Sequence, residues 1–118
     1  MFKISKQFPF SASHQLKQLP ESHPCARLHG HNYVVEVELA CEQLNQYGFV
    51  RDYNELAELK QMINERLDHQ HLNEVLGDDC VTAEQLARWV FEWCRNRWPE
   101  VTAVRISETP KTWAEYRP

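Results

Sequence analysis

The sequence has no apolar run that approaches the length of a membrane-spanning helix. Its first residues mix lysine with apolar side chains and lack the apolar segment of a secretion signal. Basic residues are also scarce, with 13 Lys and Arg against 17 Asp and Glu, for a net charge of −4. Because nucleic acids and anionic membranes attract basic surfaces, we expect neither as a partner. A cytoplasmic protein is expected.

The chain is also too short for several domains. Its 118 residues suffice for one hydrophobic core, so we expect a single domain over residues 1–118. The four cysteines of a chain without an export signal are expected to be reduced thiols. We assign three of them to packing, namely Cys41, Cys80 and Cys94.

Two segments of the first half alternate apolar and polar residues, which predicts half-buried strands. In the first, Phe2 to Ala12, Lys6 and Pro9 interrupt the alternation and predict a bulge or an edge position. The second, His31 to Cys41, is more regular. The polar segment between them, Gln15 to Leu28, is a long loop for so short a chain, and such loops are usually functional or disordered.

Two helices and two more strands are expected in the second half. Asp52-Tyr53-Asn54-Glu55 has the spacing of a capping box, and Thr82 would open a second helix in the same way, ended by Pro99. Their apolar stripes are Leu56, Leu59, Ile63 and Leu67, then Leu86, Val90, Trp93 and Cys94. Strands over Val101 to Glu108 and Thr112 to Tyr116 complete the order β-β-α-α-β-β.

Three aromatic residues near the second helix lie partly outside its stripe, namely Trp89, Phe91 and Trp98. Two interpretations remain open. These side chains can deepen the core, because aromatic residues often cover its edges. They can also form a subunit interface, where Trp and Phe are enriched.

Histidines gather around the start of the second strand. His29 and His31 flank Gly30, so on an extended backbone their side chains project on one face, the apolar one. His14 shares the parity of the apolar positions of the first strand, provided that no bulge intervenes. Three imidazoles that leave a fourth position open are typical of a catalytic zinc site. The alternative is a set of surface histidines or of core histidines with protein partners.

Further groups able to move protons lie close to this cluster in the sequence or near helix ends. Cys25 precedes His29 by four residues and Arg27 follows it, so its thiol is either activated as a base or nucleophile, or inert. Asp68 could orient His69 for proton transfer if the first helix ends there; a favourable contact of His69 with the helix dipole is the alternative. The remaining histidines are expected at the surface, namely His23 and His71.

Taken together, these motifs resemble the 6-pyruvoyl-tetrahydropterin synthase family over Phe8 to Tyr116. The motifs are Cys25-x3-His29-Gly30-His31, His14, Asp52-Tyr53, Leu67-Asp68-His69-x2-Leu72-Asn73, Thr82-x-Glu84 and Glu108-Thr109. Three residues between the cysteine and His29-Gly30-His31 resemble the bacterial branch, 6-carboxy-5,6,7,8-tetrahydropterin synthase of queuosine biosynthesis.

The resemblance implies the tunnelling fold, an α+β architecture in which a four-stranded antiparallel sheet carries two helices on one face. Three subunits would join their sheets into a barrel. Two such trimers would stack into a homohexamer with active sites at subunit interfaces. The substrate would be 7,8-dihydroneopterin triphosphate, and the products would be 6-carboxytetrahydropterin, acetaldehyde and triphosphate.

The resemblance also implies roles for individual residues. The zinc ion would be held by His14, His29 and His31. Cys25 would be the base, with Asp68 and His69 as the second proton-transfer group. Substrate contacts are expected from Glu108 at the 2-amino-pyrimidine edge, Arg27 and secondarily Lys111 at the triphosphate, and Thr82 and Glu84.

Three alternatives remain. A 6-pyruvoyl-tetrahydropterin synthase would eliminate triphosphate and keep the side chain; the short gap after Cys25 speaks against it. A non-catalytic metal- or pterin-binding module on the same fold would leave the loop thiol without a role. A cysteine hydrolase built from Cys25, His69 and Asp68 would leave His29-Gly30-His31 unexplained.

Overall fold

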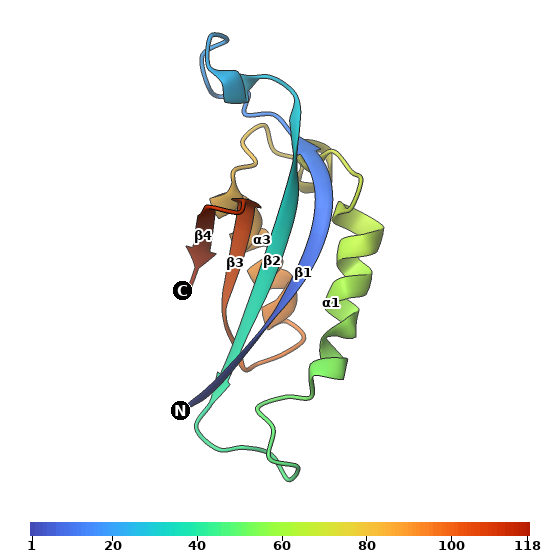
Figure 1. Ribbon diagram of the computed structural model, residues 1–118, viewed down its shortest axis with the longest axis vertical. Coiled ribbons are helices and arrows are strands. Elements are labelled where there is room, and N and C mark those ends of the chain that lie inside the picture. Colours follow the sequence, from blue (N-terminus) through green and yellow to red (C-terminus); the bar gives the residue numbers. More distant parts are fainter.

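The computed structural model describes residues 1–118 as a four-stranded antiparallel sheet with helices packed on one face (Figure 1). The strands, in their order across the sheet, are β1 (Phe2–His14), β2 (His29–Cys41), β3 (Val101–Thr109) and β4 (Thr112–Tyr116). Helix α3 (Ala83–Arg95) lies behind β3 and β4, and α1 (Ala57–Met62) lies beside β1. The arrangement confirms the predicted α+β fold class.

Strands β1 and β2 pair without interruption from Phe2 opposite Cys41 to His14 opposite His29. The bulge considered for β1 therefore does not occur, whereas the edge position does, and an edge strand tolerates Pro9 because one side of its backbone is unpaired. Strand β1 ends two residues later than predicted, at His14, and β2 begins two residues earlier, at His29, because the two strands remain paired up to these residues. The register shifts instead between β2 and β3, at Glu38 and Leu39, and between β3 and β4, from Ile106 to Thr109.

The first predicted helix is a composite. A 3-10 turn (Tyr53–Leu56) leads into α1, and a π-helical turn (Ile63–Leu67) follows. Asp52 caps the start as predicted, accepting a hydrogen bond from the Asn54 amide at 2.9 Å. The second hydrogen bond of a capping box, from the Asp52 amide to the Glu55 side chain, is not formed, because the Glu55 carboxylate accepts a hydrogen bond from Arg51 at 3.2 Å instead.

The second predicted helix is α3, which begins after Thr82 as expected. The Thr82 hydroxyl accepts a hydrogen bond from the Gln85 amide at 3.1 Å, and the helix ends at Arg95, before Pro99. A short helix that was not predicted, α2 (Leu72–Leu76), precedes it. It ends at Gly77, whose φ of +64° is readily adopted by glycine.

The core lies between the sheet and the helices. The four stripe residues of the first helix are buried, and so are Leu86, Val90 and Cys94 of α3. Trp93 was predicted in this stripe, but it is half-exposed and the Arg97 guanidinium lies 3.8 Å from its ring centroid. Phe91 is buried instead and packs on Tyr116.

Phe91 and Trp98 therefore belong to the core of this chain, while Trp89 is half-buried beneath Arg66. Burial also raises the pKa of the Cys94 thiol to about 12, which fits its predicted packing role.

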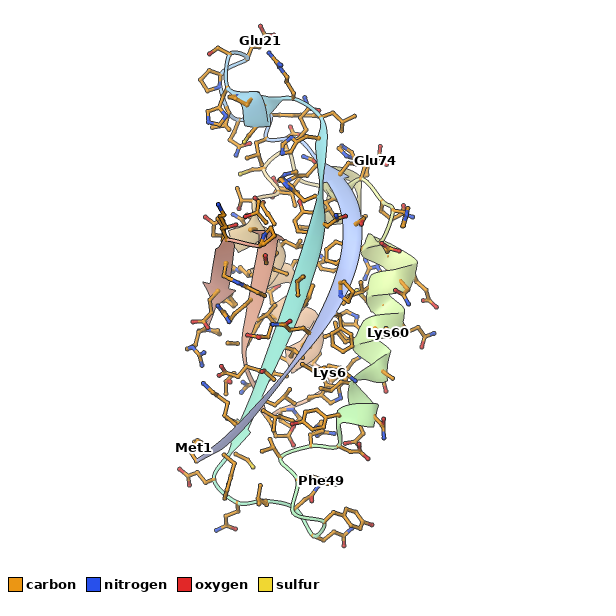
Figure 2. The ribbon with its side chains drawn as sticks, in the orientation of Figure 1. Met1, Lys6, Glu21, Phe49, Lys60 and Glu74 are labelled. Atoms are coloured by element: carbon orange, nitrogen blue, oxygen red, sulfur yellow. The ribbon has the colours of Figure 1, made fainter.

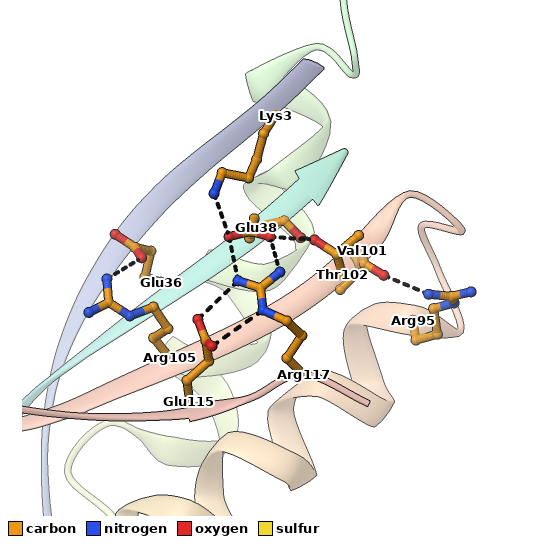
Figure 3. A network of polar contacts seen from close by, with 9 residues as sticks. All are labelled: Lys3, Glu36, Glu38, Arg95, Val101, Thr102, Arg105, Glu115 and Arg117. Carbon is orange, nitrogen blue, oxygen red and sulfur yellow. Dashed lines mark hydrogen bonds and ion pairs between the residues drawn. The ribbon is translucent and has the colours of Figure 1, made fainter. Parts of the chain in front are cut away.

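The sheet face opposite the helices carries a network of charged side chains (Figure 3). At its centre the Glu38 carboxylate, 8% exposed, receives hydrogen bonds from both terminal nitrogens of Arg117 at 2.6 and 2.9 Å. Thr102 donates a third at 2.7 Å, and the Lys3 ammonium lies 3.4 Å away. The network ties the C-terminal end of the chain to β2.

The molecule is elongated, measuring 55 × 25 × 24 Å. Figure 2 shows the loop that bears Glu21 at one end and the loop that bears Phe49 at the other. None of the helices has the length and apolar character needed to cross a membrane. The histidine-bearing ends of β1 and β2 lie toward the Glu21 loop, because that loop connects these two strands.

Candidate metal and catalytic site

Three histidines converge where β1 ends and β2 begins. His14 lies opposite His29, and His31 lies opposite Ala12. All three share the sheet face of Tyr33 and face the core, as the alternation predicts. One ring nitrogen of each lies within 4.8 Å of the others, a geometry that can hold a metal ion.

Backbone carbonyls orient two of the three rings. The Nδ1–H of His14 donates to the Val81 carbonyl at 2.6 Å, and that of His29 donates to the Arg27 carbonyl at 2.6 Å. A carbonyl only accepts, so Nδ1 carries the proton and the lone pair is on Nε2. The Nε2 of His14 is buried and has no partner. A metal ion would satisfy this atom, so the residues present fit a metal.

The surroundings of His14 and His31 favour the neutral form of these two imidazoles. Burial lowers the pKa of His14 and of His31, and it outweighs the opposite effects of the Val81 carbonyl on His14 and of Glu108 on both. One carboxylate oxygen of Glu108 lies 4.0 Å from the Nε2 of His31, which is too far for a hydrogen bond. Because the neutral ring is the form that binds metals, burial favours coordination at neutral pH.

Sequence reasoning missed the two carbonyl groups that hold His14 and His29. Val81 directly precedes the capping residue of α3, and Arg27 lies in the loop before β2. A backbone acceptor has no signature in residue type, so no sequence signal was available. The placement of the Val81 carbonyl depends on the segment before α3, which meets the residues after β1 through the Leu16–Cys80 bridge and a hydrogen bond from the Lys17 amide to the Asp79 carbonyl at 3.1 Å.

Tyr33 is a second residue that the sequence did not single out. Its ring stacks on Phe10 with centroids 5.0 Å apart and meets the edges of His31 and His14 at 5.4 and 6.0 Å. The ring is 1% exposed, and its hydroxyl has no hydrogen-bond partner. Burial raises the pKa of Tyr33 far above its usual value, so the hydroxyl keeps its proton.

Asp68 and His69 form a dyad at the outer edge of β1, where the chain after the first helix binds the strand. One Asp68 oxygen accepts a hydrogen bond from the Ser11 amide at 2.9 Å, and the other lies 2.9 Å from the Nδ1 of His69. The Ser11 amide, and then His69, lower the pKa of Asp68, which is therefore ionised at neutral pH. The helix ends at Asp68, as this contact requires, and the His69 ring is 82% exposed.

The segment after the dyad follows the edge of β1. His71 was expected at the surface, but it is half-buried and its Nδ1 lies 3.0 Å from the Ser13 hydroxyl. The prediction was wrong because the Ser13 amide binds the Gln70 carbonyl at 3.1 Å and so draws this segment onto the strand. Asn73 extends the attachment through two hydrogen bonds to the backbone of Gln15.

Cys25 lies in a 3-10 turn (Pro24–Ala26) of the long loop and is half-buried. Its amide donates to the exposed His23 ring at 3.1 Å, and its carbonyl accepts from the Leu16 amide at 3.0 Å, two residues beyond His14. The thiol is not part of the three-histidine group. No hydrogen bond joins it to Asp68 or His69, and Cys25 does not line the cleft that contains His69.

A cleft of about 440 Å³ includes both His31 of the cluster and His69 of the dyad in its lining. Gly30 belongs to this lining, and a Cβ atom there would lie 3.2 Å from the Ala12 carbonyl oxygen. A larger residue would press on the neighbouring strand. The other lining residues are Ser11, Ala12, Ser13, Asn32 and Gln70.

The remaining predicted substrate residues are less closely tied to the cluster. Arg27, Glu84 and Lys111 are exposed, and their side chains form no hydrogen bond or ion pair. The Thr82 hydroxyl is used in capping α3. The structure thus brings Glu108 to the histidines and leaves the other four at or near the surface.

Comparisons with known proteins agree with the geometry. A family model described as 6-pyruvoyl tetrahydropterin synthase matches residues 3–118. The 6-carboxy-5,6,7,8-tetrahydropterin synthase of Synechocystis sp. is 34% identical over 122 residues, covering 98% of this chain and 93% of the relative. That of Bacillus subtilis is 28% identical and covers 99% of this chain and 86% of the relative. The solved structure of Caenorhabditis elegans 6-pyruvoyl tetrahydropterin synthase matches with a TM-score of 0.86 and 27% identity, covering 99% and 95%.

Proposed function

This chain belongs to the 6-pyruvoyl tetrahydropterin synthase family of pterin enzymes, and we propose that it is a zinc-dependent 6-carboxy-5,6,7,8-tetrahydropterin synthase. It would act as a carbon–carbon lyase of queuosine biosynthesis, converting 7,8-dihydroneopterin triphosphate to 6-carboxytetrahydropterin, acetaldehyde and triphosphate. We further propose a single domain over residues 1–118 and a cytoplasmic location.

The observation that carries this proposal is the buried Nε2 of His14, which lacks a partner inside a cluster of three imidazoles. Three imidazole nitrogen ligands suit Zn²⁺ and leave a coordination position for substrate. Zinc bound by His14, His29 and His31 would supply a Lewis acid that polarises a hydroxyl oxygen of the substrate side chain.

The chain's own residues would bind the substrate and move the protons. Cys25, as a thiolate, would remove a proton from the pterin side chain, and His69, held by the ionised Asp68, would exchange the second. Glu108 would accept hydrogen bonds from the N–H groups at the 2-amino-pyrimidine edge. Arg27 is the first candidate for the triphosphate, with Lys111 second, and Thr82 and Glu84 would add contacts from the start of α3.

We also propose a homohexamer, a dimer of trimers, with active sites at subunit interfaces. Two features support it. Strand β4 and most of β1 are edge strands without a neighbour, so each can pair with another copy. Cys25 does not line the cleft that contains the exposed His69, so a site that uses both is more easily completed by residues from two chains.

The proposal is tested by incubating zinc-loaded protein with 7,8-dihydroneopterin triphosphate, with and without a chelator, and identifying products by mass spectrometry. We expect 6-carboxytetrahydropterin and acetaldehyde, and no turnover with the chelator. Turnover that resists the chelator would favour the cysteine hydrolase, and bound but unconverted pterin would favour the non-catalytic module.

A second candidate is the pyruvoyl-type synthase, which the match to the nematode structure favours. The same experiment distinguishes it, because its product keeps the carbon atoms of the side chain. The names of the Synechocystis and Bacillus relatives and the short gap after Cys25 support the carboxy product.

A further inference from the structure

Two buried side-chain atoms have no hydrogen-bond partner anywhere in the structure, the Nε2 of His14 and the hydroxyl of Tyr33. A metal ion in the histidine cluster accounts for the first. The ion does not account for the Tyr33 hydroxyl, because the group that can hold a metal consists of the three histidines and does not include Tyr33. A buried hydroxyl without an acceptor is costly, so its retention calls for a partner that arrives with the ligand.

The sheet register identifies that partner. Val34 of β2 lies opposite Ser107 of β3 in the last pair of this antiparallel register, so Tyr33 and Glu108 are the next residues on the two strands. The Glu108 carboxylate lies 4.0 Å from the Nε2 of His31, which places it on the histidine-bearing, helix-covered face that Tyr33 shares.

Glu108 offers the acceptor that the Tyr33 hydroxyl lacks. Its carboxylate accepts no hydrogen bond, and its nearest cationic or imidazole group is His31 at 4.0 Å. When His31 binds a metal, its lone pair is no longer available to other groups. The buried Tyr33 hydroxyl is a donor without an acceptor, and the Glu108 carboxylate, 26% exposed, receives no hydrogen bond from the protein.

We propose that Tyr33 is a positioning residue, whose hydroxyl donates a hydrogen bond to Glu108 when pterin fills the site. One carboxylate oxygen is thereby held, and the other is aimed at the N–H groups of the ligand. The inference rests on the proposed function and adds a residue that its mechanism does not use. Because the Tyr33 ring is clamped between Phe10 and His31, it offers a rigid support for a flexible glutamate.

The test measures binding of neopterin to zinc-loaded protein by fluorescence titration. Tyr33→Phe removes the hydroxyl and keeps the ring, and we expect it to weaken neopterin binding about tenfold or more, since tenfold is the lower end of the range for a hydrogen bond to a charged group. Zinc affinity should be unchanged, and the thermal midpoint unchanged or higher, because the lost hydroxyl had no partner. The control Tyr116→Phe, on β4 beside Phe91, should leave binding unchanged.

A double-mutant cycle with Glu108→Gln separates positioning from packing. If Tyr33 acts through the carboxylate, Tyr33→Phe weakens binding in the wild-type protein and has much less effect when it is combined with Glu108→Gln. Equal losses in both backgrounds, or no loss in either, would overturn the assignment. Reduced zinc affinity in Tyr33→Phe would also overturn it. Failure of the wild-type protein to bind neopterin would instead reject the proposed function, and this inference with it.

Discussion

Polar groups are paired with one another on one face of the central sheet, whereas buried polar atoms without a partner occur on the other face. On the uncovered face, Glu38 is satisfied by Arg117, Thr102 and Lys3, and Glu36 binds Arg105 at 2.9 Å (Figure 3). On the helix-covered face, His14 and Tyr33 each keep a buried polar atom without a partner. Strand β2 contributes to both faces, because successive residues point to opposite sides.

This difference suggests that the charged face contributes to stability and the helix-covered face to ligand binding. A fully paired network lowers the free energy of the folded chain and needs nothing from outside. Unpaired buried groups raise that free energy and persist where a ligand completes them. Substitutions on the two faces should therefore affect different measurements, the unfolding free energy on one face and ligand binding or turnover on the other.

The largest effect is expected from His29→Ala. Losing one of three ligands should reduce bound zinc to a minor fraction, measured by elemental analysis, and turnover about a thousandfold, since a Lewis acid contributes several kcal/mol. Glu38→Gln, on the opposite face, is the control and should keep its zinc. Full zinc content in His29→Ala would refute the metal site.

Next in size is Cys25→Ala. We expect turnover to fall about a hundredfold or more with zinc content intact, because a general base contributes at least that factor. The matched control is Cys80→Ala, another half-buried thiol, which should retain activity. Equal turnover in the two variants would remove Cys25 from the mechanism.

On the charged face, Glu38→Ala should lower the free energy of unfolding by about 2 kcal/mol, because it leaves the Thr102 and Arg117 donors without their carboxylate. Glu92→Ala breaks only the exposed pair with Arg88 and should cost about 0.5 kcal/mol or less. Urea unfolding gives both values. A loss in Glu38→Ala no larger than that in Glu92→Ala would contradict a stabilising role for this network.

The same carboxylate predicts a pH dependence. Hydrogen bonds from Arg117 hold the pKa of Glu38 at about 2, below its ordinary value of 4.5. Because the folded pKa is the lower one, the stabilisation is complete above about pH 4.5 and is lost as pH falls toward 2. Urea midpoints measured across this range should drop more steeply in wild type than in Glu38→Gln. Parallel curves would contradict the prediction.

The smallest effect is expected at Thr82, beside the carbonyl that orients His14. Thr82→Ala should lower the unfolding free energy by about 1 kcal/mol through loss of the helix cap, and Thr82→Ser should keep most of it. If Thr82 also contacts substrate through its hydroxyl, the alanine variant should raise KM and the serine variant should not. Steady-state kinetics separates the two roles.

Much of the site could be predicted because it depends on local rules. Period-two alternation places His29 and His31 on one face of the sheet. The same alternation along β1 places His14 on that face, because β1 contains no bulge. The caps at Asp52 and Thr82 follow from side chains that bind nearby amides. Each of these inferences needs only a few consecutive residues, so no knowledge of the packing was required.

Other features arise from contacts between segments far apart in the chain. The Val81 carbonyl fixes His14 across 67 residues, and Ser13 draws His71 out of solvent. Phe91 is buried because Tyr116 of β4 packs on it beneath α3, whereas Trp93 packs against the core only in part. Residue types and their spacing are enough to place side chains on a face of the sheet. The choice of which distant group meets them is made by packing, because a contact's energy depends on both of its partners and only the folded chain brings them together.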